Sequence, residues 1–125
     1  MARVDFHIGK VEIQAEFNDS VTAGRILEAL PLEAVGNFWG AEFYFEIPVQ
    51  VPAEPGAREV VEPGTVAYWP QGHCLCLFWG PTPVSRSGEC RAASQVNVVG
   101  RVLNADDLWK LKHRRVRVAT GARTS

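Results

Sequence analysis

The sequence predicts a mainly β protein with about eight strands and two short helices. Three observations support this fold class. Apolar and polar residues alternate with a period of two in many short segments, clusters of Gly, Pro and Asn separate these segments, and only two stretches show helical spacing. So many strands in one domain favour a barrel or a sandwich. A chain of 125 residues forms a single domain, residues 1–125, and is long enough to bury a core.

The chain opens with a β-hairpin that is followed by a helix. Within residues 4–16, apolar and polar residues alternate on both sides of Gly9-Lys10, which forms the turn. A short helix is expected over 22–30, where Ser20 or Thr22 supplies the N-cap. A proline directly after this stretch ends the helix.

The middle and the end of the chain consist mostly of strands. In the strand expected over 42–51, Phe43 and Phe45 point to one side, while Glu42 and Tyr44 point to the other. Glycines and prolines mark the loops that separate the later elements. These elements are strands at 59–61, 66–69, 74–78, 94–103 and 114–119, and a second helix over 104–111 that Asn104 caps.

Composition and charge exclude several classes of function. The net charge of −1 gives no overall attraction to nucleic acid or to an anionic membrane. No apolar run is long enough for a signal peptide or a transmembrane helix, so we expect a cytoplasmic protein with no nucleic acid and no membrane as partners. Six of the 13 Lys and Arg residues lie from Lys110 onward, which we interpret as a solvated strand and a terminal tail.

The cysteines and histidines form no recognisable metal or catalytic motif. Three cysteines are an odd number, which argues against a disulfide framework, so all three are expected to be free thiols. Cys74 and Cys76 share one face of a strand, but a metal would need two further ligands. No nucleophile–base motif or phosphate-binding loop occurs, so the sequence predicts no metal and no cofactor.

A candidate ligand site combines aromatic and polar side chains at strand ends and in loops. Aromatic walls supply apolar burial, while a carboxylate, hydroxyls and an amide orient a ligand. Other interpretations stay open: a solvated outer face for the carboxylate, core plugs for the tryptophans, and for Asn97 a bond to loop backbone, such as that at 80–85. Because the carboxylate disfavours an anion, we expect a neutral or cationic ligand or a peptide. The predicted ligand-binding residues are Glu42, Tyr44, Trp69, Trp79, Thr82 and Asn97.

Several motifs resemble those of one known family. They are Asn37-Phe38-Trp39-Gly40 with Glu42, Tyr68-Trp69-Pro70, Phe78-Trp79-Gly80 with Thr82-Pro83, and Ala93-Ser94 with Val96-Asn97-Val98-Val99-Gly100. Over nearly the whole chain, they resemble the cyclophilin-like family of small, uncharacterised bacterial and archaeal proteins. The resemblance implies a closed cyclophilin-like β-barrel of about eight strands with two short helices that cover its ends.

The resemblance also bears on function. True cyclophilins use an arginine in a Phe-His-Arg motif, which this sequence lacks, although Arg58, Arg86 and Arg91 could reach in from loops. We therefore expect a protein that binds a small neutral or cationic ligand or a proline-containing peptide, without robust prolyl isomerase activity. The alternative is an enzyme with weak prolyl isomerase or amide-hydrolase-related activity, because the wider superfamily includes subunits of amide-hydrolysing complexes.

Overall fold

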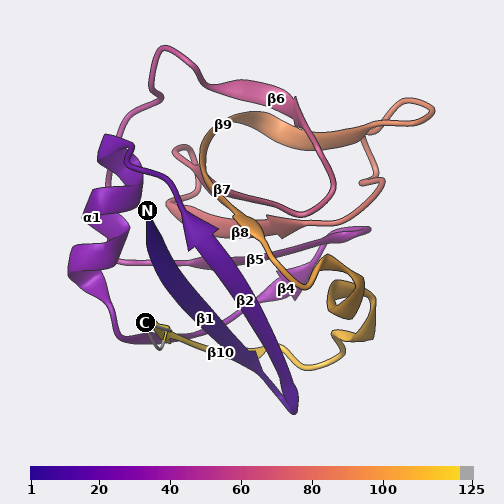
Figure 1. The fold of residues 1–125 in the computed structure, drawn as a ribbon. Helices are drawn as coiled ribbons and strands as arrows, with labels where there is room; N and C mark the ends of the chain where they lie inside the picture. The colour runs from indigo at the N-terminus through magenta and orange to yellow at the C-terminus, as the bar shows by residue number, and fades with distance from the viewer. Residues whose placement is uncertain (122–125) are drawn as a thin grey trace.

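The structure is a computed structural model, and it describes residues 1–121 (Figure 1). This part of the chain contains ten strands, one α-helix and one 3-10 helix. In chain order these are β1 (Ala2–Ile8), β2 (Val11–Phe17), α1 (Val21–Ala29), β3 (Leu32–Val35), β4 (Asn37–Phe38), β5 (Glu42–Glu46), β6 (Arg58–Val61), β7 (Thr65–Trp69), β8 (Cys74–Phe78), β9 (Cys90–Val102), η1 (Ala105–Lys110) and β10 (Arg115–Thr120).

Nine of the strands follow one another in a single hydrogen-bonded path. Their order is β3-β10-β1-β2-β9-β7-β8-β5-β4, and the neighbours pair antiparallel. The remaining strand, β6, pairs with the first part of β9. The 13-residue β9 therefore pairs with three strands, and it curves from β6 past β7 to β2 (Figure 1).

The two ends of this path, β3 and β4, are consecutive segments joined by Gly36. The N–H of Gly36 donates to the carbonyl of Arg114 at 2.7 Å, while β4 already pairs with β5. At Gly36 the chain passes from pairing with β10 to pairing with β5. A Cβ at this position would lie 2.4 Å from the ring of Phe43, so the passage requires glycine. The sheet is thus strongly curved, but a chain connection rather than hydrogen bonds joins its edges. The fold is mainly β, as predicted, and closure of the barrel by hydrogen bonds is not confirmed.

The main core lies on the inner face of the sheet. Strand alternation sends Phe6, Phe17, Phe43 and Phe45 into it, and all four are at most 1% exposed. The rings of Phe6 and Phe45 meet edge to face, with their centroids 6.4 Å apart. Helix α1 adds Ile26 at the side of this core.

A second, smaller apolar cluster lies on the outer face of β7 and β8. Strand β6 and the first half of β9 cover this face, so it is buried although it lies outside the main core. Cys74, Cys76 and Cys90 all belong to this cluster and all three are free thiols, as the cysteine count predicted. The second cluster matters for function because the candidate site lies beside it.

Both predicted helices occur, with differences at their starts. The Oγ of Ser20 accepts a backbone N–H of the first turn of α1 at 3.2 Å, so Ser20 is the N-cap. The second helix is the 3-10 helix η1, and Asn104 makes no side-chain cap. Its Oδ1 instead accepts the N–H of Gln14, and its Nδ2 donates to the carbonyl of Glu12. Neither helix in residues 1–121 has the length and apolar character needed to cross a bilayer.

The predicted strands are present, but one is shorter, and β9 begins at Cys90 rather than at residue 94. Strand β5 ends at Glu46 rather than at residue 51. Pro48 has no N–H to donate, so it cannot continue the strand. The carbonyl of Val49 accepts a hydrogen bond from the Tyr68 hydroxyl instead of from a neighbouring strand. The short β3 and β4 raise the number of strands from about eight to ten. Arg123, the last residue of the predicted basic stripe, lies outside the described residues.

Candidate functional site

Strand alternation places four side chains of functional interest on the outer face of β5, β8 and β7. Tyr44 pairs with Cys76 across β5 and β8, and Glu42 precedes Tyr44 by two residues on the same strand face. Cys76 pairs in turn with Ala67 of β7, and Trp69 lies two residues further along that strand. These side chains therefore face away from the main core.

The first part of β9 folds over this face and leaves a cleft of about 260 Å³, which we call the aromatic cleft. Three aromatic rings and one carboxyl group lie among small or apolar side chains. This composition, mostly apolar with a few polar groups, is usual for small-molecule sites. The lining residues are Trp39, Glu42, Tyr44, Trp69, Cys76, Ala92, Ala93 and Val96.

Glu42 is the one charged residue among those that line the cleft. It is only 5% exposed, and its Oε1 has no hydrogen-bond partner within the described residues. Within residues 1–121, no lysine, arginine or histidine lines the cleft beside it. A buried carboxylate without a partner is costly, since water can no longer solvate the charge.

Burial raises the pKa of Glu42 to about 7, and the neighbouring Cys76 thiol opposes this rise only in part. The Cys76 thiol donates to the carbonyl of Cys74 at 3.8 Å, and its weak hydrogen bond to the Glu42 carboxyl lowers the pKa of that group only in part. By geometry, Oε1 of Glu42 still has no partner among the described residues. Burial, and then the negative charge of Glu42, raise the pKa of Cys76 well above its usual range. The thiol therefore stays protonated, while the carboxyl changes its charge near neutral pH.

Trp69 is held in position by its neighbours. Its Nε1–H donates to the Oγ of Ser94 at 2.6 Å, and the Ser94 hydroxyl donates to Gln71 at 3.1 Å. The ring also lies against Gly72, where a Cβ would approach the ring to 2.3 Å. The ring therefore needs little reorganisation to receive a ligand, which reduces the entropy lost on binding.

Trp79 and Thr82, which the sequence-based site includes, do not line the cleft. Trp79 directly follows β8, and its side chain belongs to the main core. Its ring also meets the exposed rings of Phe38 and Trp109 edge to face, with centroid distances of 6.4 Å. The Thr82 hydroxyl donates to the carbonyl of Arg91 and so fastens the loop after β8 to the start of β9. Both residues support the framework around the cleft.

Asn97 does not line the cleft either. It is 2% exposed, and its Oδ1 accepts the N–H of Glu54 at 2.8 Å. Its Nδ2 donates to the Oγ1 of Thr22 and to the carbonyl of Pro52, both at 3.0 Å. Asn97 thus satisfies loop backbone, which was one of its two interpretations, but the loop is 52–54 rather than 80–85.

Sequence reasoning missed Trp39, Cys76 and the three residues that β9 contributes. Trp39 stands in a turn, where its N–H donates to the carbonyl of Glu42 at 2.9 Å, and no alternation indicates where a turn side chain points. Cys76 looked like a core thiol, and it is one, but its strand face is also the floor of the cleft. The period of two in β8 was the available signal.

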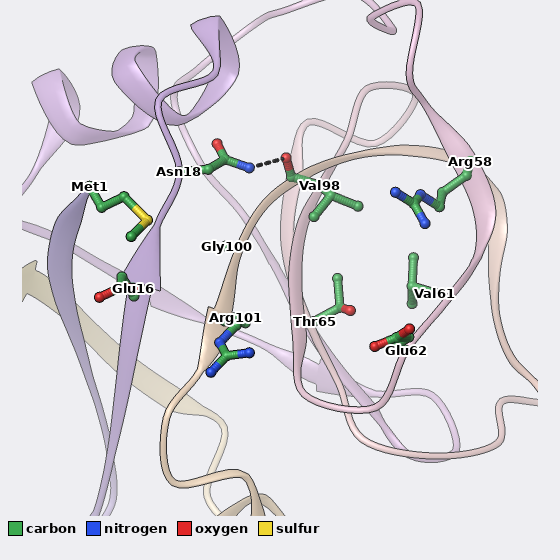
Figure 2. A pocket seen from close by; sticks show the side chains of 10 residues that line it. All are labelled: Met1, Glu16, Asn18, Arg58, Val61, Glu62, Thr65, Val98, Gly100 and Arg101. Carbon is green, nitrogen blue, oxygen red and sulfur yellow. Dashed lines mark hydrogen bonds between the residues drawn. The ribbon is translucent and has the colours of Figure 1, made fainter.

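A second hollow, of about 380 Å³, lies between β2, β6, β7 and β9. Figure 2 shows that the Arg58 side chain reaches from β6 toward β9 there, and the dashed line marks the bond from Asn18 to the Val98 carbonyl, 3.0 Å long. Its charged lining residues include exposed Arg58, Glu62 and Arg101. Among the described residues, no buried unpaired polar atom lines this hollow, so it is the weaker candidate.

Metal binding has no support from side-chain geometry in residues 1–121. No group of three or more His, Cys, Asp or Glu side chains lies close enough to hold an ion in this range. Glu42 and Cys76 alone supply fewer protein ligands than the three or four that zinc sites use.

Comparisons with known proteins agree with this architecture. The family model described as cyclophilin-like matches residues 2–119. The solution structure of the hypothetical protein AF2241 from Archaeoglobus fulgidus is similar, with 35% sequence identity and a TM-score of 0.81 over 96% of this chain and 95% of that one. None of the curated proteins matches the chain. The chain therefore belongs to the cyclophilin-like family.

Proposed function

We propose that the protein binds a small neutral or cationic ligand, or a proline-containing peptide, in the aromatic cleft. The observation that carries this proposal is the Oε1 atom of Glu42, which is buried and unpaired within the described residues. Buried polar atoms are nearly always hydrogen-bonded, and an exception needs an explanation. A ligand that donates a hydrogen bond to this oxygen, or that places positive charge beside it, supplies the explanation.

The other lining residues fit the same role. Trp39, Tyr44 and Trp69 offer apolar surface, and a volume of about 260 Å³ suits a molecule below drug size or a single side chain of a peptide. In this proposal Glu42, Tyr44 and Trp69 contact the ligand. Of the other residues of the sequence-based site, Thr82 and Asn97 hold β9 and its loops by hydrogen bonds, while Trp79 belongs to the main core.

Filling the cleft is expected to abolish ligand binding. Ala93 is exposed at the cleft, so Ala93→Trp should fill the space without disturbing the core. Ligand-observed NMR with a mixture of small neutral and cationic compounds and prolyl peptides should give compounds that bind the wild type and lose at least about tenfold in affinity for the variant. Gln95→Trp, at an exposed position outside the cleft, is the matched control. Binding that survives Ala93→Trp would reject this site.

Prolyl isomerase activity is expected to be absent or very weak. The barrier to rotation is about 18–20 kcal/mol, and cyclophilins lower it with an arginine. No arginine among the described residues lines the aromatic cleft, and Arg58 lines the other hollow instead. The NMR exchange rate of a Xaa-Pro peptide should not change on addition of the protein, while a true cyclophilin accelerates it in the same assay. Catalysis that disappears in Arg58→Ala would show that the arginine reaches the peptide after all.

One observation favours a second candidate, an enzyme of the amide-hydrolase type. A carboxyl group with a pKa of about 7 inside a cleft suits general acid–base catalysis at neutral pH. Among the described lining residues there is no unprotonated nucleophile, because burial keeps the Cys76 thiol protonated. Hydrolysis of an amide with a rate that changes near pH 7, and that is lost in Glu42→Gln, would favour the enzyme over the binding protein.

A further inference from the structure

We propose that the aromatic cleft selects an organic ammonium cation, with the positive head against the Glu42 carboxylate and among the rings of Trp39, Tyr44 and Trp69. This inference rests on the proposed function and narrows it from a neutral or cationic ligand to one class. The ammonium group can belong to a free amine or to the side chain of a lysine, since both present the same head.

The charge balance of the cleft is the first argument. The part of its lining that the structure describes contains one carboxyl group and no basic side chain. The titratable groups that act on this carboxyl or feel its charge are the thiols of Cys74 and Cys76 on β8 and of Cys90 on β9. None of these groups supplies positive charge, so a cation has to come from the ligand.

The aromatic lining is the second argument. The face of an aromatic ring carries negative charge density, and it attracts ammonium groups most strongly where water is excluded. Three of the eight lining residues are aromatic, and Trp69 is already fixed by Ser94 and Gly72. Several aromatic rings around one cation are the arrangement by which proteins recognise alkylated ammonium ions, and in this cleft the Glu42 carboxyl adds negative charge to three such rings.

A metal ion is a poorer occupant of the same space. Hard cations such as calcium need six to eight oxygen ligands, and magnesium needs six. The described lining residues provide two carboxylate oxygens and the Tyr44 hydroxyl, together with apolar surface that a bare ion does not use. The cleft therefore fits a cation that is itself partly apolar.

The test compares two ligands that have the same shape and differ in charge. Choline and its uncharged carbon isostere, dimethylbutanol, are titrated into the full chain at pH 8 and followed by NMR. We expect choline to bind about tenfold more tightly than the isostere, from cation–aromatic and carboxylate contacts together. In Glu42→Gln, choline should lose the carboxylate's share of this preference and keep only the smaller share due to the rings, while the affinity of the isostere should not change.

The pH provides a second readout. With the pKa of Glu42 at about 7, the carboxyl becomes neutral as the pH falls. As the pH falls from 8 to about 5, choline affinity should decrease by less than about tenfold in total and reach the level of Glu42→Gln, because only the ionised carboxyl attracts the cation. The affinity of the isostere should stay constant over the same range.

The outcomes separate this inference from the proposed function. Equal affinity of choline and the isostere, both lost in Ala93→Trp, would overturn the ammonium inference and leave the binding site intact. The ammonium inference would also be overturned if neither choline nor the isostere binds while other compounds bind the wild type and not Ala93→Trp. If no compound is sensitive to Ala93→Trp, the proposed function itself fails. Tighter binding of an acetylated trimethyl-lysine amide than of choline would support the inference and identify a peptide side chain as the source.

Discussion

Between pH 4.5 and 7, the wild type is expected to lose about 3 kcal/mol of unfolding free energy that Glu42→Gln does not lose. The pKa of this carboxyl is about 7 in the folded protein and 4.5 without the effects of folding. Below pH 4.5 both states are protonated, and the full stability is present. Between pH 4.5 and 7 the unfolded chain releases its proton while the folded protein keeps it, so the wild type loses stability as the pH rises. Above pH 7 the loss is complete.

Urea unfolding between pH 4 and 8.5 measures this effect. The difference in unfolding free energy, Glu42→Gln minus wild type, should increase by about 3 kcal/mol across the window, because glutamine does not titrate. Glu46 lies two residues beyond Tyr44 on the same strand face but is exposed, so Glu46→Gln is the matched control variant. Parallel curves for the wild type and Glu42→Gln would mean that water or a partner reaches the carboxyl in the folded protein.

Part of the candidate site could be predicted from local alternation. The period of two over β5 separates Glu42 and Tyr44 from Phe43 and Phe45, and the structure has them on opposite faces. What alternation cannot show is whether an outer face stays in water. Here it is buried because the first half of β9 folds back over it, and the small residues there, such as Ala92 and Ala93, give no strong sequence signal.

The same limit explains why the sequence-based site gathers residues that the fold separates. Trp69 and Trp79 both stand next to Gly or Pro at strand ends. Trp69 falls on the outer face of β7, whereas Trp79 continues the inner face of β8. One therefore faces the cleft and the other the main core. The edges of the sheet were equally hard to predict, because β4 spans two residues, too few to show any period.

Asn97→Ala is expected to destabilise the protein by about 3 kcal/mol without weakening binding in the aromatic cleft. The amide joins β9 to α1 through Thr22 and to the 52–54 loop through Glu54 and Pro52. Each of these partners loses its hydrogen bond in the variant. An unpaired buried group costs about 1–3 kcal/mol, and water entering the loop side reduces the sum.

Chemical denaturation of the variant and of Gln95→Ala isolates this contribution. Gln95 is exposed on the same strand, so its replacement should change the unfolding free energy by less than about 0.5 kcal/mol. At a temperature where Asn97→Ala remains folded, any ligand of the aromatic cleft should bind it with wild-type affinity, since no Asn97 atom lines the cleft. A stable variant with reduced affinity would instead place the amide in contact with the ligand. The structural account of Asn97 would then be wrong, because its three hydrogen bonds would have to be exchanged for bonds to the ligand on binding.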